Sequence, residues 1–200
     1  MLRQLSRSSL LKRCIRLNQK VSSMSSFESP LLASWPSGLP PFSRINASHF
    51  KPAFEVAMAQ HLLELKDVVD SSEEPTFENT ISKFDRAGRL FCQVEGVYSN
   101  LCLSDCKPEL QAVELEMAGP LEAHKNAQFM FEGLFEKIDA VYQKREAVGL
   151  NLEQKRLVEK IHLEFVRNGA KFDSAAKEEY SKITERLAEL QIQFSQVRSK

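Results

Sequence analysis

The chain has 200 residues, of which 42% are hydrophobic and 27% are charged, as in ordinary globular proteins. Its net charge is zero, but the first 27 residues hold six basic residues and no acidic one, which leaves a net charge of −6 on the remainder. An acidic remainder argues against a nucleic-acid-binding protein, and no apolar run reaches the roughly 18 residues that a membrane span requires. We therefore expect neither nucleic acid nor membrane as a partner.

Residues 1–27 have the composition of a targeting sequence, because they are rich in arginine and serine and lack acids. In a helix, one side would carry Leu10, Leu11, Cys14 and Ile15, and the basic residues would lie largely on another. These features are typical of an organellar transit peptide. They favour the mitochondrial matrix, with the plastid or the cytosol as alternative locations and a disordered basic tail as the alternative interpretation.

Residues 28–46 form the next segment, which we expect to be an extended arm. Four prolines and a glycine between Pro30 and Phe42 exclude a regular element there. The segment is nevertheless apolar, with Leu31, Leu32 and Trp35 among its residues. We therefore expect it to pack along a surface instead of acting as a free linker.

Residues 47–200 show one helical signal after another and no strand-like alternation. Ser48 can cap a first helix that has Pro52 in its first turn. Thr76 is the expected N-cap of a second helix, whose apolar stripe runs to Leu101. Asp105, with Pro108 close behind, is expected to open a third helix, which Gly119-Pro120 should break or kink.

The last three helices carry the clearest end signals. A fourth apolar stripe runs from Phe131 to Tyr142, and Asn151 with Gln154 predicts a capping box for a fifth helix that Gly169 ends. In the last helix the apolar gaps run 3-4-3-4-3, a coiled-coil-like seam made of Tyr180, Ile183, Leu187, Leu190, Phe194 and Val197. The sequence thus predicts an all-α fold: a multi-helix lobe over 47–200 that ends in a long antiparallel helical hairpin joined at Gly169, preceded by the Pro-rich arm.

The chain offers no complete catalytic site. Its four histidines are His49, His61, His124 and His162. None of them has a second histidine four residues away, so the sequence contains no zinc-binding H-E-x-x-H helix. Cys102 and Cys106 could share a helical face, but no third ligand is near in sequence. Glycine-rich phosphate loops and a G-x-S-x-G motif are absent, and acid runs such as Glu73-Glu74 suit solvated faces. We predict no catalytic, cofactor-binding or metal-binding residue in this chain.

Four ordered blocks of the sequence resemble oligopeptidase A and its thimet-oligopeptidase relatives. The first block is Pro30-Leu31-Leu32 with Leu39-Pro40-Pro41-Phe42, Ile45, His49 and Pro52-Ala53. The others are Pro75-Thr76-Phe77-Glu78-Asn79-Thr80, then Ser99-Asn100-Leu101 with Pro108-Glu109-Leu110, then Asn168-Gly169 with the helix through Leu187-Ala188-Glu189-Leu190 to Phe194-Ser195. The resemblance covers nearly everything after residue 28, and it departs from the family pattern after Ser195, where the family continues with further helices.

This resemblance implies an almost wholly helical fold with two lobes beside a deep channel for short peptides. In the family, zinc lies on an H-E-x-x-H helix of the C-terminal part, where it activates water and the glutamate acts as general base. We therefore expect zinc only in that catalytic part, which lies beyond this chain, and we expect short peptides and the catalytic lobe as partners.

Two hypotheses follow. The first is that the chain is the N-terminal, substrate-admitting lobe of an organellar zinc metallo-oligopeptidase that degrades short peptides such as cleaved presequences, and is inactive alone. The second is a standalone, non-catalytic helical module that binds peptides or another protein. The first predicts a large exposed apolar surface, and the second predicts a polar one.

Overall fold

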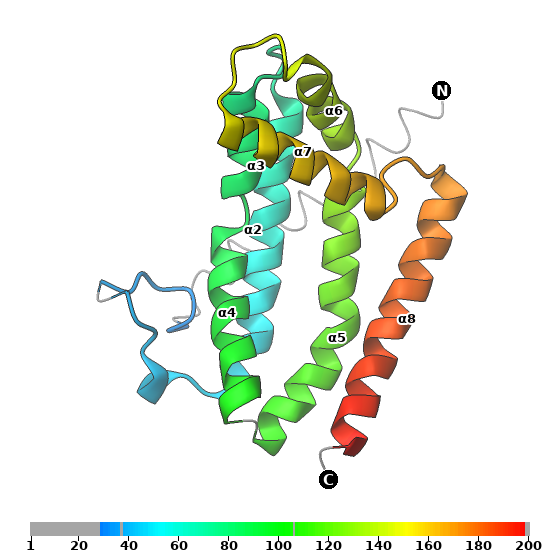
Figure 1. Cartoon of the computed structure of the whole chain (residues 1–200). Coiled ribbons are helices and arrows are strands. Elements are labelled where there is room, and N and C mark those ends of the chain that lie inside the picture. Colours follow the sequence, from blue (N-terminus) through cyan, green and yellow to red (C-terminus); the bar gives the residue numbers. More distant parts are fainter. Residues whose placement is uncertain (1–28, 37, 106, 199–200) are drawn as a thin grey trace. The chain divides into compact units, whose positions relative to one another are not determined.

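The computed structural model describes residues 29–36, 38–105 and 107–198, so the predicted presequence and Cys106 lie outside the described residues. Helices and turns make up the described part of the chain, with no strand in it, which confirms the all-α fold class (Figure 1). No helix in that part is long and apolar enough to cross a membrane.

The helices divide between two compact units, which we describe separately. The first unit comprises Met1–Leu63 and Gly88–Val113, and the second comprises Glu64–Ala87 and Glu114–Lys200. Two helices, α2 (Phe50–Asp70) and α5 (Pro108–Phe129), contribute residues to both units.

The first unit contains the 3-10 turns η1 (Phe42–Arg44) and η2 (Ala47–His49), the first part of α2, and α4 (Arg89–Ser104). An aromatic cluster joins α2 to α4, since the ring of Tyr98 meets Phe50 and Phe54 edge-on, each at 5.3 Å between centroids. Phe50 and Phe54 are fully buried. These contacts make the start of α2 the core of the unit.

Hydrogen bonds from a side chain of α4 to the backbone of the arm hold the arm against this helix. The side-chain amide of Gln93 donates to the carbonyl oxygens of Leu31 at 2.8 Å and Ala33 at 3.2 Å, and Leu31 is fully buried. The indole of Trp35 donates to the carbonyl of Pro30 at 2.9 Å. These bonds satisfy carbonyl groups that an irregular segment cannot pair within itself.

The second unit contains the π-helical turn η3 (Phe77–Ile81) and the helices α3 (Ser82–Arg86), α6 (Leu134–Lys144), α7 (Leu152–Arg167) and α8 (Ser174–Arg198), with the later part of α5. Its core centres on the fully buried Phe165 of α7. The Phe165 ring lies 5.1 Å from Phe129, 5.3 Å from Phe84 and 6.2 Å from Phe135. One aromatic side chain therefore connects α3, α5, α6 and α7.

Three predicted helix ends, at Thr76, Asn151 and Gly169, are confirmed. The Thr76 hydroxyl accepts from the Asn79 N–H at 3.1 Å, and the Asn151 side chain accepts from the Gln154 N–H at 2.9 Å. Gly169 has a φ of +83° just after α7. The first cap differs from the prediction, because Asn46 precedes η2, while the Ser48 hydroxyl donates to the Asn46 side chain at 2.6 Å.

Three longer-range expectations need correction. The apolar stripe from Thr76 to Leu101 is interrupted at Gly88, whose φ is +75°. The helix α5 continues through Pro120, so of the two predicted outcomes there, a break or a kink, the break is wrong. The third concerns α8, whose antiparallel neighbour is α5, whereas sequence proximity points to α7 (Figure 1). Tertiary packing determines where these helices end and which helices pair, and helix propensity alone does not predict either feature.

Candidate functional site: an apolar pocket and an exposed helical seam

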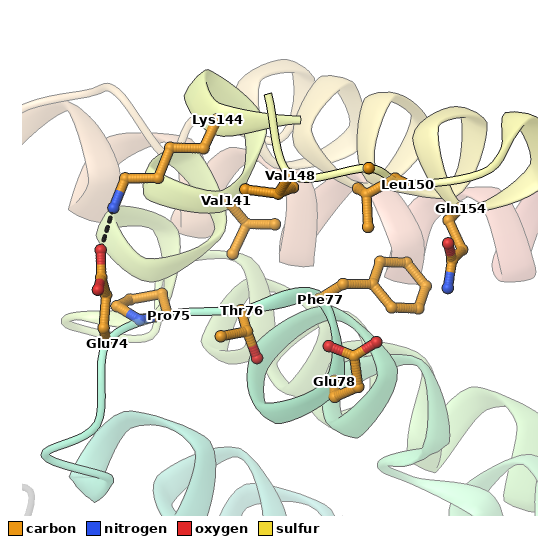
Figure 2. A pocket seen from close by; sticks show the side chains of 11 residues that line it. Glu74, Pro75, Thr76, Phe77, Glu78, Val141, Lys144, Val148, Leu150 and Gln154 are labelled. Atoms are coloured by element: carbon orange, nitrogen blue, oxygen red, sulfur yellow. Dashed lines mark hydrogen bonds and ion pairs between the residues drawn. The ribbon is translucent and has the colours of Figure 1, made fainter. Parts of the chain in front are cut away.

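The second unit has a cavity of about 410 Å³ between η3 and the loop that joins α6 to α7 (Figure 2). Its lining is largely apolar, with Pro75, Phe77, Val141, Val148 and Leu150 facing the space. The other lining residues are Glu74, Thr76, Glu78, Lys144, Gly149 and Gln154. A concave, mostly apolar surface with a few polar groups at its edge is the usual form of a small binding site.

Two capping boxes fix the walls of this pocket. On one wall the Thr76 N–H also donates to the Asn79 side chain at 2.8 Å, which holds η3 in place. On the other wall the Asn151 N–H donates to the Gln154 side chain at 3.0 Å, and Gly149 turns the loop with a φ of +70°. Such reciprocal hydrogen bonds hold the chain direction at a helix start, so both walls are built from rigid elements.

Charge lies at the rim of the pocket and not in its floor. Lys144 forms an ion pair with Glu74, and the hydrogen bond and positive charge of Lys144 hold the pKa of the Glu74 carboxyl below its ordinary value. Glu78 is an exposed lining residue. With one cation neutralised by one of two carboxylates, the rim keeps an excess negative charge.

A second cavity of about 400 Å³ lies within the first unit. It is lined by Phe42, Ile45, Asn46, Ala47, Phe50, Leu101, Asp105, Lys107, Glu109 and Leu110. Residues from two of the family-like blocks thus meet around one cavity, and the Pro75–Thr80 block supplies one wall of the other. Sequence reasoning gave no signal for Lys144 at the end of α6, or for Val148 and Leu150, which the following loop brings over η3.

The four histidines lie in different surroundings. His49 accepts the Asn46 N–H on Nδ1 at 3.2 Å, and His61 is buried with its ring 6.1 Å from Phe91. His162 stacks on Tyr142 at 3.9 Å, with Nε2 2.9 Å from the Asp139 carboxylate. His124 is buried in the later part of α5.

The described residues contain no group of three or more His, Cys, Asp or Glu side chains that could hold a metal ion. Cys102 is half-buried on α4, and Cys106 lies outside the described residues.

An exposed apolar seam lies on α8. The five side chains that form it, with their exposed fractions, are Ile183 (60%), Leu187 (51%), Leu190 (44%), Phe194 (66%) and Val197 (72%). A contiguous apolar surface on a folded protein usually marks an interaction site.

The chain matches known peptidases over most of its length. It is 34% identical to dipeptidyl carboxypeptidase of Escherichia coli (strain K12) over 157 residues, which is 78% of this chain and 23% of that protein. The chain is a homologue of these peptidases. It is also 27% identical over 168 residues to organellar oligopeptidase A, chloroplastic/mitochondrial, of Arabidopsis thaliana, and 28% identical over 170 residues to oligopeptidase A of Escherichia coli (strain K12).

These last two matches cover 84% and 83% of this chain, and 21% and 24% of the relatives. The chain thus spans about a quarter of the length of the curated relatives it matches. No protein-family model matches it. The resemblance that the ordered sequence blocks indicate is confirmed, and what the homology establishes is a relationship to part of a peptidase.

Proposed function

We propose that this chain is the N-terminal helical lobe of an organellar zinc metallo-oligopeptidase and that it helps admit short peptides to a catalytic centre located elsewhere in the protein. The observation that carries the proposal is the match to dipeptidyl carboxypeptidase over 78% of this chain. Zinc and the residues that activate water belong, in this proposal, to the remaining part of the enzyme. The substrates are short peptides such as cleaved presequences.

The pocket beside η3 supports a role in peptide contact. Its apolar lining suits an aliphatic or aromatic side chain, and its rim suits a cationic one, because Glu78 adds a negative charge beside the Glu74–Lys144 pair. The lining contains no histidine or cysteine, and its one amine, that of Lys144, is paired with Glu74. The pocket therefore suits the binding of a peptide side chain.

The mitochondrial matrix is the proposed location. Six basic residues without an acid in residues 1–27 support it, together with the homology to an organellar oligopeptidase A. Fusion of a fluorescent reporter to the whole chain should direct it to mitochondria, and deletion of residues 1–27 should leave the reporter in the cytosol. Import that persists after the deletion would contradict the proposal.

The standalone binding module is the competing function. It predicts a polar surface, whereas the seam on α8 exposes five large apolar side chains. That observation favours a chain that works with further protein surface. The transcript beyond codon 200 is the most direct test: an open frame that encodes H-E-x-x-H supports the enzyme lobe, and a stop codon with stable expression of the short product supports the module.

The peptide-binding role can be tested on the purified 200-residue chain. The probe is a fluorescein-labelled decapeptide of leucine and arginine, followed by fluorescence polarisation. Val148→Glu places a charge in the pocket lining and should weaken binding about tenfold or more. Leu152→Glu is the matched control, because Leu152 is 86% exposed, lies four residues away and is not in the lining.

Equal affinity of the two variants would contradict pocket binding. The same preparation should show no zinc-dependent cleavage of short peptides. Chelator-sensitive hydrolysis by a clean preparation would show that the chain is catalytic by itself.

A further inference from the structure

Polar and apolar groups occupy different parts of the pocket beside η3. Figure 2 shows Glu74 and Lys144 at one end of the pocket, with Glu78 and Gln154 toward the other end. The apolar side chains between the two ends are those of Val141, Val148 and Leu150. A ligand that fills the cavity therefore contacts apolar groups in its middle and polar groups at its ends.

The two carboxylates of the pocket differ in their partners. Glu74 forms an ion pair with Lys144, which joins the segment before η3 to the last residue of α6. Glu78 is exposed, and its side chain forms no ion pair or hydrogen bond in the described part of the chain. Because the charge of Lys144 is already matched by Glu74, the free negative charge of the pocket lies at Glu78.

The local structure of η3 does not depend on the Glu78 carboxylate. Thr76 and Asn79 exchange both bonds of the capping box, at 2.8 Å and 3.1 Å, and Glu78 takes no part in either. The residue stands between two members of this box, so the rigid turn fixes its position at the pocket. Its carboxylate is thus held in place and available to a ligand.

A peptide with a cation beside an apolar side chain is complementary to this arrangement. The apolar side chain fills the middle of the pocket, and the neighbouring cation faces Glu78. An acidic neighbour would instead place two negative charges together. Permanent cover by another part of the protein fits less well, because it would remove the unpaired Glu78 carboxylate from water, which is costly.

Presequences have this chemistry. In residues 1–27 of this chain, Leu11 is followed directly by Lys12 and Arg13, and no acid is present. Apolar and basic residues that stand side by side without acids are typical of organellar targeting sequences. The free charge at Glu78 therefore matches the substrate class of the proposed function.

We propose that Glu78 makes the pocket selective for peptides in which a basic residue stands next to the apolar residue that enters it. The inference rests on the proposed function, since it requires that the pocket binds peptides, and it adds the residue that sets the preference. Because Glu78 is exposed, the preference for a basic over a neutral neighbour should be about two- to fivefold. It should shrink as salt screens the charge.

Fluorescence polarisation of the 200-residue chain with two fluorescein-labelled decapeptides tests the selectivity. One peptide alternates leucine and arginine, and the other alternates leucine and glutamine. At low ionic strength the wild-type chain should bind the leucine–arginine peptide more tightly by the factor given above. Glu78→Gln should lose most of this preference and keep its affinity for the leucine–glutamine peptide.

Glu153→Gln is the matched control. Glu153 is an exposed acid in the first turn of α7 and does not line the pocket. The variant removes the same charge from the chain as Glu78→Gln does, so it reports any general attraction between an acidic protein and a basic peptide. It should keep the wild-type preference.

The outcomes separate this inference from the proposed function. Binding of neither peptide by the wild-type chain would overturn both, because the pocket would then not bind peptides. Binding of both peptides with the same preference in wild type and Glu78→Gln would overturn the selectivity alone. An equal loss of preference in Glu78→Gln and Glu153→Gln would overturn it as well, since the effect would then come from net charge.

Discussion

The side-chain amide of Asn126 on α5 donates a 2.8 Å hydrogen bond to the hydroxyl of Thr184 on α8, and Asn126 is 94% buried (relative exposure 6%). The same hydroxyl lies 3.0 Å from the carbonyl oxygen of Tyr180, to which it donates. This bond holds α8 with its polar face inward. The exposed seam is therefore a consequence of a buried polar contact on the other side of the helix.

Replacement of the hydroxyl tests this contact. Thr184→Val keeps the shape of the side chain but leaves the Asn126 amide buried without its acceptor, which should lower the free energy of unfolding by about 1–3 kcal/mol. Urea unfolding followed by circular dichroism measures the change. Thr184→Ser keeps the hydroxyl and should lose clearly less, so an equal loss in both variants would show that the methyl group matters and the bond does not.

The Glu74–Lys144 pair gives a prediction on pH. The Lys144 hydrogen bond and charge lower the pKa of Glu74 from its ordinary value of 4.5, so the carboxylate favours the folded state above that pH and loses this contribution as the pH falls through the lowered pKa. Both side chains are solvent-exposed, so the effect on stability is small and the titration itself is the better measurement.

Carboxyl NMR titration should show the pKa of Glu74 rising towards 4.5 in Lys144→Gln. Glu146 is an internal control, because Lys155 lowers the pKa of that carboxyl and the substitution does not touch that pair. A Glu74 titration that is the same in both proteins would show that the ion pair does not form in solution.

The capping box at the start of α7 supports one wall of the pocket. Asn151→Ala removes the acceptor of the Gln154 N–H and should cost about 1 kcal/mol of stability, whereas Asn151→Asp keeps an acceptor and should cost less. Thermal unfolding measures both variants. If the Ala and Asp variants unfold at the same temperature, the side chain of Asn151 does not cap the helix.

Local chemistry explains which features the sequence predicted well. Thr76, Asn151 and Gly169 act through neighbours within four residues, so their roles follow from residue type and spacing. The sequence predicted the seam on α8 from the periodic spacing of its apolar residues. This spacing does not predict which face of the helix packs against the rest of the unit. That choice depends on Asn126, which is 58 residues away from Thr184 along the chain.

The pocket could be predicted only in part. The Pro75–Thr80 block was visible through its resemblance to a family, and it supplies one wall. The opposite wall comes from Val148, Gly149 and Leu150, in a loop whose path is set by α6 and α7 and not by a motif of its own. Nothing in the sequence distinguishes Lys144 from other surface lysines, because its partner Glu74 is distant in sequence.

Gly88 shows why the second predicted helix is interrupted. Its φ is +75°, a conformation that side-chain-bearing residues rarely adopt, and a Cβ atom there would lie 2.9 Å from the His61 ring. The backbone of Gly88 thus approaches a buried histidine of α2 as closely as only glycine allows. Gly88→Ala should destabilise the protein by about 1–3 kcal/mol.

Gly96 is the matched control, because it lies inside α4 with no atom within 4 Å of a built Cβ. Gly96→Ala should stabilise the protein by about 0.5–1 kcal/mol, since alanine is the better helix former. Urea unfolding of the two variants should therefore shift in opposite directions from the wild type. Two shifts of the same sign would show that the close approach of Gly88 to His61 does not determine where α4 begins.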